Sequence, residues 1–97
     1  MRINLIIKRH WFDEIRAGRK RQEFRDITPR LINQICNLDK DGNFESYKPI
    51  TEILLLNGYH KKRPTMLVEC LGIEIAPGQA GELFAFNLGK VLKVENC

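Results

Sequence analysis

The sequence has no long apolar run. The longest, Ile53–Leu56, is far shorter than the ~20 residues that a transmembrane helix needs. The apolar stretch near Met1 is also too short for a signal peptide, and no small-residue cleavage site follows it. We therefore expect a cytoplasmic protein that has no membrane partner and begins with its first structural element.

Cysteine and histidine are scarce. Cys36, Cys70 and Cys97 are an odd number at wide spacings without a Cys-x-x-Cys pair, which favours two buried thiols and one near the terminus over disulfides. The cysteines and the two histidines lack zinc spacing. Residues 39–45 place their glycine fourth rather than sixth, so a turn is favoured over a calcium loop. With no phosphate-binding glycine loop either, we expect no metal and no cofactor.

The length of 97 residues predicts one domain, 1–97. A hydrophobic fraction of 43% suits a single core. A domain of this size buries roughly 60–65% of the surface that its unfolded chain exposes. Because that leaves little material to enclose a deep site, we expect an open cleft.

Positive charge is unevenly distributed along the chain. Residues 1–30 carry a net charge of +5 and residues 61–63 add +3, whereas residues 31–59 and 64–97 each carry −2. If the two basic stretches meet in space, they form one face suited to phosphates. The alternative is that they are solvated charges on separate faces.

Apolar periodicity predicts five strands and two helices. Alternation at Ile3, Leu5 and Ile7 indicates the first strand. A short helix over 10–17 should end at Gly18, a residue suited to left-handed backbone. A second helix should start with Thr28 as its N-cap. The other strands are predicted at 21–27, 50–56, 65–75 and 84–94, with a loop or hairpin tip at 37–49 and a bulge at residue 89.

The side-chain repeat of strands and helices also predicts which way several side chains point. In the strand over 21–27, Phe24 is expected to point inward while Glu23 and Arg25 share the opposite face. In the first helix, Trp11 and Ile15 share a face, and packing of Trp11 into the core is favoured over its use as a stacking surface. The element order predicts an α+β domain, a small mixed β-barrel with two short helices packed on it.

The segment from Gly18 to Arg25 contains the strongest candidates for ligand-binding side chains. It joins a helix to a strand, a junction that places side chains at the rim of a barrel. Lys20 supplies a mobile point charge and Arg25 a rigid fork for phosphate or a base edge. Glu23 between them would hold one of the cations, accept from a base amino group, or act as a general base. A salt-bridged, solvated edge strand is the plain alternative.

The run Gly18-x-Lys20-x-x-Glu23-x-Arg25 resembles the signature of the ASCH domain family, a branch of the PUA-like fold. The flanking strand, short helix and late strands are similar to that family as well, so the resemblance covers nearly the whole chain. It implies a β-barrel with a cleft lined by the motif and a role in binding RNA or nucleotides. Lys8, Lys20 and Arg25 would then contact phosphate.

Some bacterial members of that family hydrolyse an acetylated cytidine with a Lys, a Thr and a Glu. Lys20 matches their Lys, but Glu23 stands at the Thr position, and the counterpart of their Glu is Glu69 or Glu74. The alternative function is therefore a small amidohydrolase in which Lys20 and Glu23 are catalytic.

A second basic stretch follows the strand over 50–56. It combines an aromatic ring, Tyr59, with Lys61, Lys62 and Arg63. Rings for bases and charges for the backbone are what single-stranded nucleic acid requires. Either this stretch extends the binding surface or it is an exposed loop without a ligand.

Overall fold

The computed structural model describes residues 1–96 and confirms the α+β class with two short helices. The elements are β1 (Arg2–Ile7), α1 (Arg9–Arg16), β2 (Gln22–Asp26), α2 (Pro29–Ile35), β3 (Cys36–Leu38), β4 (Phe44–Tyr47), β5 (Glu52–Asn57), β6 (Thr65–Gly78) and β7 (Gly81–Glu95). Neither helix in this part of the chain has the length and apolar character to span a bilayer.

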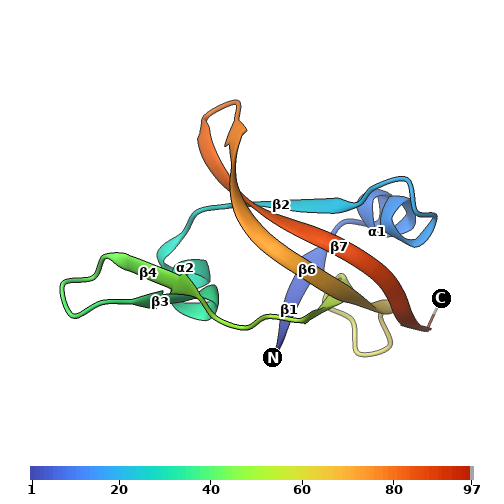
Figure 1. Ribbon diagram of the computed structural model, residues 1–97. Helices are drawn as coiled ribbons and strands as arrows, with labels where there is room; N and C mark the ends of the chain where they lie inside the picture. The colour runs from blue at the N-terminus through green and yellow to red at the C-terminus, as the bar shows by residue number, and fades with distance from the viewer. Residues whose placement is uncertain (97) are drawn as a thin grey trace.

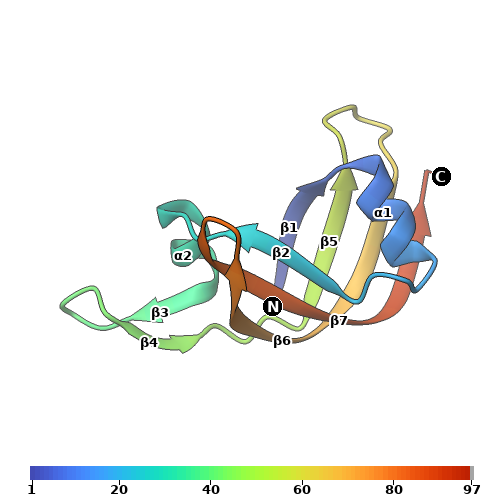
Figure 2. The ribbon, with the colours of Figure 1, turned by 90° about the horizontal axis from the view of Figure 1, so that it is seen from above.

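Five strands form one sheet in the order β1-β5-β6-β7-β2. β1 and β5 run parallel, and the other neighbours are antiparallel, as the arrows in Figure 2 show. β3 and β4 form a separate two-stranded hairpin where a loop or hairpin tip was expected over residues 37–49, so these two strands were not predicted. The strand pairing within residues 1–96 does not join β1 to β2, so these two strands are the ends of the sheet.

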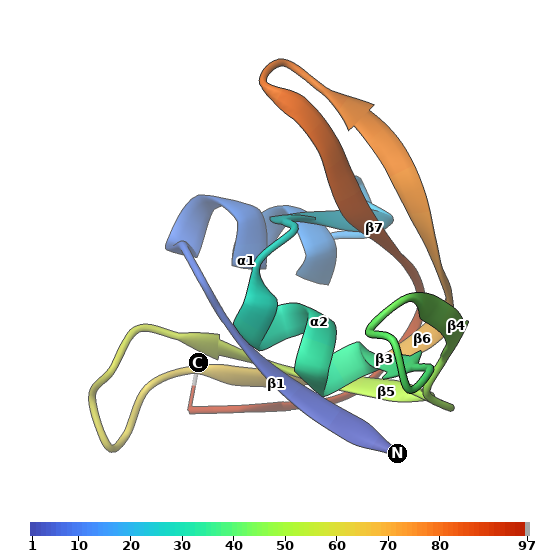
Figure 3. The same ribbon diagram turned by 90° about the vertical axis from the view of Figure 1, so that its left-hand side faces the viewer.

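β6 and β7 form a long hairpin that rises away from the rest of the molecule (Figure 1 and Figure 3). The register shifts where Val68 faces Val91 and Cys70 faces Leu88, which confirms the irregularity predicted at Gly89. A Cβ at Gly89 would lie 2.8 Å from Glu69 Oε1, so only glycine fits there without movement. The turn between the two strands is short, because β6 extends to Gly78 and β7 begins at Gly81.

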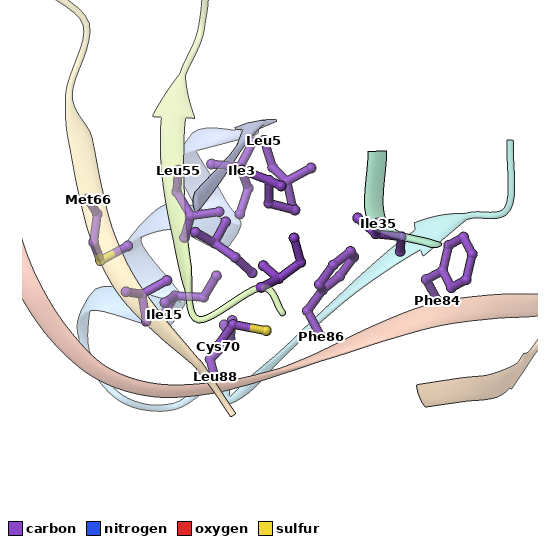
Figure 4. Packing of buried hydrophobic residues seen from close by; sticks show 14 of the residues in the cluster. Ile3, Leu5, Ile15, Ile35, Leu55, Met66, Cys70, Phe84, Phe86 and Leu88 are labelled. Carbon is purple, nitrogen blue, oxygen red and sulfur yellow. The ribbon is translucent and has the colours of Figure 1, made fainter. Parts of the chain in front are cut away.

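One hydrophobic core joins both helices to the sheet (Figure 4). The alternation in β1 buries Ile3, Leu5 and Ile7, as predicted. Phe12 and Ile15 of α1 lie three residues apart on the buried face, since that spacing returns to one side of a helix. Cys36 and Cys70 are buried free thiols, as expected, and Cys97 lies outside the described residues.

Two predicted orientations are wrong. Phe24 is 42% exposed whereas Glu23 is 5% exposed, because β2 pairs with β7 in a register that sets Glu23 opposite the buried Phe86. Glu23 and Arg25 do share a face, but it is the core face at the edge of the sheet. Trp11 is 45% exposed rather than packed in the core, since its neighbour Phe12 takes the buried position of α1.

Candidate functional site

A tight helix end places the segment from Gly18 to Arg25. Gly18 has φ +79°, the left-handed conformation predicted for it, and its N–H donates to Ile15 O at 3.0 Å. The N–H of Lys20 donates to Glu14 O at 3.2 Å. The chain therefore turns back along α1 before entering β2, which brings Lys20 beside the exposed ring of Trp11.

Glu23 is the one buried charged residue in the part of the chain that the structure describes. Its Oε2 accepts from Arg25 Nη2 at 2.8 Å, and its Oε1 lies 3.6 Å from Lys20 Nζ. A buried carboxylate is costly unless it is paired, and here each oxygen faces a cation. The motif thus forms one linked unit of a carboxylate and two basic groups.

Arg25 also connects the two ends of the sheet. The same Nη2 that donates to Glu23 donates to the backbone oxygen of Ile6 in β1 at 2.7 Å. β2 and β1 therefore approach each other across a seam that one guanidinium bridges. The planar guanidinium of an arginine has several donors in fixed directions and is suited to bridging two acceptors in this way. The ammonium of a lysine lacks that fixed, planar arrangement of donors.

The ammonium of Lys20 lies over two aromatic rings. It is 5.0 Å from the ring centroid of Trp11 and 5.1 Å from that of Phe24, within cation–π distance of both. This arrangement fixes a long side chain that would otherwise be mobile. The outward orientation of Phe24 therefore lets its ring cover Lys20.

These groups line an open cleft of about 560 Å³. We call it the central cleft, and its walls are formed by β1, the start of α1 and β2, with lining residues Ile6, Ile7, Lys8, Trp11, Lys20, Glu23, Phe24 and Arg25. The expectation of an open cleft is thereby met. Three basic groups, one carboxylate and two half-exposed rings in one hollow can bind an anion that carries a planar group.

Two further basic residues close to Lys20, namely Lys8 and Arg19, differ in whether they are free to bind a ligand. Lys8 is exposed at the N-cap of α1, lines the central cleft and has no ion-pair partner among residues 1–96. Arg19 turns away and donates to both carboxylate oxygens of Glu14 at 2.8 and 3.1 Å. Those hydrogen bonds lower the pKa of Glu14. The cleft therefore draws its charge from Lys8, Lys20 and Arg25.

The second basic stretch lies in the loop between β5 and β6. Tyr59 is 83% exposed, and Lys61 and Lys62 are exposed beside it. The side-chain amide of Asn57 donates to Ile7 O at 3.1 Å, which holds the start of this loop near the end of β1. None of Tyr59, Lys61 and Lys62 lines the central cleft, so the structure brings this stretch to the same end of the sheet but not into the hollow.

The two glutamates considered as partners of Lys20 are engaged elsewhere. Glu69 Oε1 accepts from the backbone N–H of Lys90 at 2.8 Å beside the bulge in β7. Glu74 Oε1 accepts from the side chain of Gln22 at 3.3 Å. Neither lines the central cleft.

The sequence did not reveal three parts of the cleft, the first of which is Trp11, expected in the core. The second is Phe24, which is also expected in the core. In a strand as rich in charge as β2, the sequence does not show which of the two faces is buried. The third is the wall formed by Ile6 and Ile7, which comes from a strand that is remote in the chain. The alternation of β1 indicated which residues are buried, but not that its free edge faces β2.

No group of three or more His, Cys, Asp or Glu in residues 1–96 is arranged to hold a metal ion. Comparison with known proteins gives no match, neither to a family model nor to a curated protein or a solved structure.

Proposed function

We propose that this chain is an ASCH-like domain of the PUA-like fold that binds RNA or a nucleotide in the central cleft. The single observation that carries the proposal is the cleft itself, where Lys8, Lys20 and Arg25 stand beside the half-exposed rings of Trp11 and Phe24. Phosphate oxygens are the natural partners of the basic groups, and a base has a flat face that stacks on an exposed ring.

The PUA-like part of the proposal is supported by the way the sheet ends approach. A barrel needs the two end strands to come together, and the contact from Arg25 to Ile6 O brings β2 to β1. In this proposal the seam is closed by a side chain in place of a strand ladder. Ligand would then enter along the seam, where backbone and side-chain groups of both strands are accessible.

Glu23 has an orienting role in this proposal. Its two oxygens hold Lys20 and Arg25 on one side of the cleft, so the cations are placed before a ligand arrives. Ordering these long side chains in advance reduces the entropy lost on binding.

The amidohydrolase alternative has one favourable observation, the 3.6 Å separation of Glu23 Oε1 and Lys20 Nζ at the wall of the cleft. A general base must take a proton from water, however, and both oxygens of Glu23 already face cations. We therefore place binding ahead of hydrolysis. Incubation with acetylated cytidine and chromatography separates the two functions, since a free cytidine product that disappears in Lys20→Ala would favour the enzyme.

Trp11 supplies a direct test of binding, because it is the one tryptophan of the chain and lies in the cleft. Its emission is expected to change on titration with uridine monophosphate or a short single-stranded RNA at low salt. Lys20→Ala should weaken that binding about tenfold, whereas Lys40→Ala, an equal charge change outside the cleft, should not. Unchanged emission and absent binding by the wild type at low salt would refute the proposal.

A further inference from the structure

The central cleft has a neighbouring hollow on each side. The first, of about 360 Å³, reaches toward α2 and shares Ile6 and Arg25 with the cleft. The second, of about 440 Å³, lies against β7 and shares Lys20 with the cleft. The three hollows therefore adjoin one another at Ile6, Arg25 and Lys20. We call them together the furrow.

The furrow follows the chain along β2. The β7 side is lined by residues within 18–21, the centre by residues 23–25, and the α2 side by residues within 26–30. Some residues within the two outer ranges do not line the furrow. The five residues of β2 alone span ~17 Å. Successive phosphates of a stacked strand lie ~3.4 Å apart along its axis. The furrow is therefore long enough for several nucleotides.

Net charge is concentrated along the furrow. Seven Lys or Arg residues and three carboxylates line it, a balance of +4 that equals the net charge of the whole chain. The rest of the protein is therefore electrically balanced. The basic residues occur in all three parts, namely Lys8, Lys20 and Arg25 in the centre, Arg30 toward α2, and Arg16, Arg21 and Lys90 toward β7.

In the part of the chain that the structure describes, guanidinium groups without a partner occur only in the furrow. Outside it, Arg2, Arg9 and Arg19 are ion-paired with carboxylates and Arg63 donates to Gly58 O. By contrast, the side chains of three furrow arginines have no hydrogen-bond or ion-pair partner within residues 1–96; they are Arg16, Arg21 and Arg30. A guanidinium has five donors in a fork that fits phosphate. Unpaired arginines at both ends of the furrow are therefore free to bind phosphates there.

We propose that the furrow binds an extended single-stranded nucleic acid and not a lone nucleotide, an inference that rests on nucleotide binding in the central cleft. Arg16 and Arg21 would hold phosphates on one side of that cleft and Arg30 on the other. The rings of Trp11 and Phe24 in the middle can stack only on bases that are not already paired. That requirement selects a single strand over a duplex.

The test compares two triple variants with equal charge change. The furrow variant is Arg16→Gln/Arg21→Gln/Arg30→Gln, and the control is Arg2→Gln/Arg9→Gln/Arg19→Gln, whose side chains lie outside the furrow in exposed ion pairs. Binding of a single strand of about twelve nucleotides, as RNA and as DNA, is measured by anisotropy between about 50 and 200 mM salt. Uridine monophosphate, followed by Trp11 emission, reports on the central cleft alone.

The furrow variant is expected to bind the single strand about tenfold more weakly, with a salt slope lower by about 2, because each lost phosphate contact removes about 0.7. Its affinity for uridine monophosphate should be unchanged, and the control variant should keep the wild-type slope within about 0.7. Thermal unfolding of both variants confirms that they are folded.

Several results would overturn the inference. Equal affinity of the wild type for the single strand and for uridine monophosphate would confine binding to the central cleft and leave the proposed function intact. Equal or tighter binding of duplex, or of inorganic polyphosphate, would show a surface for any polyanion. If neither the single strand nor uridine monophosphate binds, the proposed function fails and the inference falls with it.

Discussion

Glu23→Gln tests whether the buried carboxylate organises the seam between β1 and β2. Glutamine keeps an oxygen for Arg25 but removes the charge that faces Arg25 at 2.8 Å and Lys20 at 3.6 Å. The remaining bond still has the charged Arg25 donor, so it weakens by at most the difference between a hydrogen bond to a charged group, about 1.5–3 kcal/mol, and a neutral one, about 0.5–1.5 kcal/mol. The Arg25 contact should therefore lose at most about 1 kcal/mol. The looser Lys20 contact, which is partly exposed, should lose up to about 1 kcal/mol more.

The expected loss is thus up to about 2 kcal/mol in the free energy of unfolding. For a domain of this size each kcal/mol corresponds to ~4–8 °C in Tm, so Tm should fall by up to about 15 °C. Urea unfolding and thermal unfolding, both followed by circular dichroism, measure the change. An unchanged urea m-value would show that the loss lies in the native state.

Glu52→Gln is the matched control. Glu52 pairs with Arg2 across β1 and β5 at 3.3 Å, but both side chains are much more exposed than Glu23. Such a surface pair contributes about 0–1 kcal/mol and is screened by salt. Equal losses in the two variants, or a Glu23→Gln effect that disappears in high salt, would refute the claim that burial strengthens the Glu23 contacts.

Three other changes should separate backbone, packing and ionisation effects. Gly18→Ala places a residue with a side chain in the left-handed conformation, at φ +79°, and should lower the free energy of unfolding by about 1–2 kcal/mol. Gly18→Asn should lower it less. Urea unfolding measures both changes, and an alanine variant as stable as the wild type would contradict the left-handed conformation at Gly18. Met66→Ala, at a fully buried position, should cost about 2–5 kcal/mol, whereas Leu71→Ala, which is 69% exposed, should cost about 0.5 or less; similar values would count against the described core. Burial raises the pKa of the Cys36 and Cys70 thiols, so the unfolded chain loses these protons at lower pH, and stability should fall as pH rises above about 8.5. Urea unfolding across that pH range should show a smaller decrease of the free energy of unfolding in C36A/C70A than in the wild type. An equal decrease in the two proteins would refute this cause.

The chain order of helices and strands was predictable because each depends on local pattern. Alternation identified β1, and Thr28 before Pro29 identified the start of α2, where Thr28 Oγ1 accepts from Leu31 N–H at 3.2 Å. The helix end at Gly18 and the bulge at Gly89 were also predictable, since glycine is among the few residue types that favour these conformations. Charge and motif likewise located the segment from Gly18 to Arg25 as the centre of the candidate site.

What the sequence alone determined about this protein is therefore the two helices, the five strands of the main sheet, the buried face of β1 and the motif that lines the cleft. Tertiary structure decided which face of β2 is buried, because that depends on its register with β7: Glu23 lies opposite Phe86, and Phe24 turns outward to cover Lys20. It also decided that β1 and β2 meet at a seam, bridged from Arg25 to Ile6 O. Contacts between strands so far apart in the chain depend on how the whole sheet bends, and no local pattern encodes that bend.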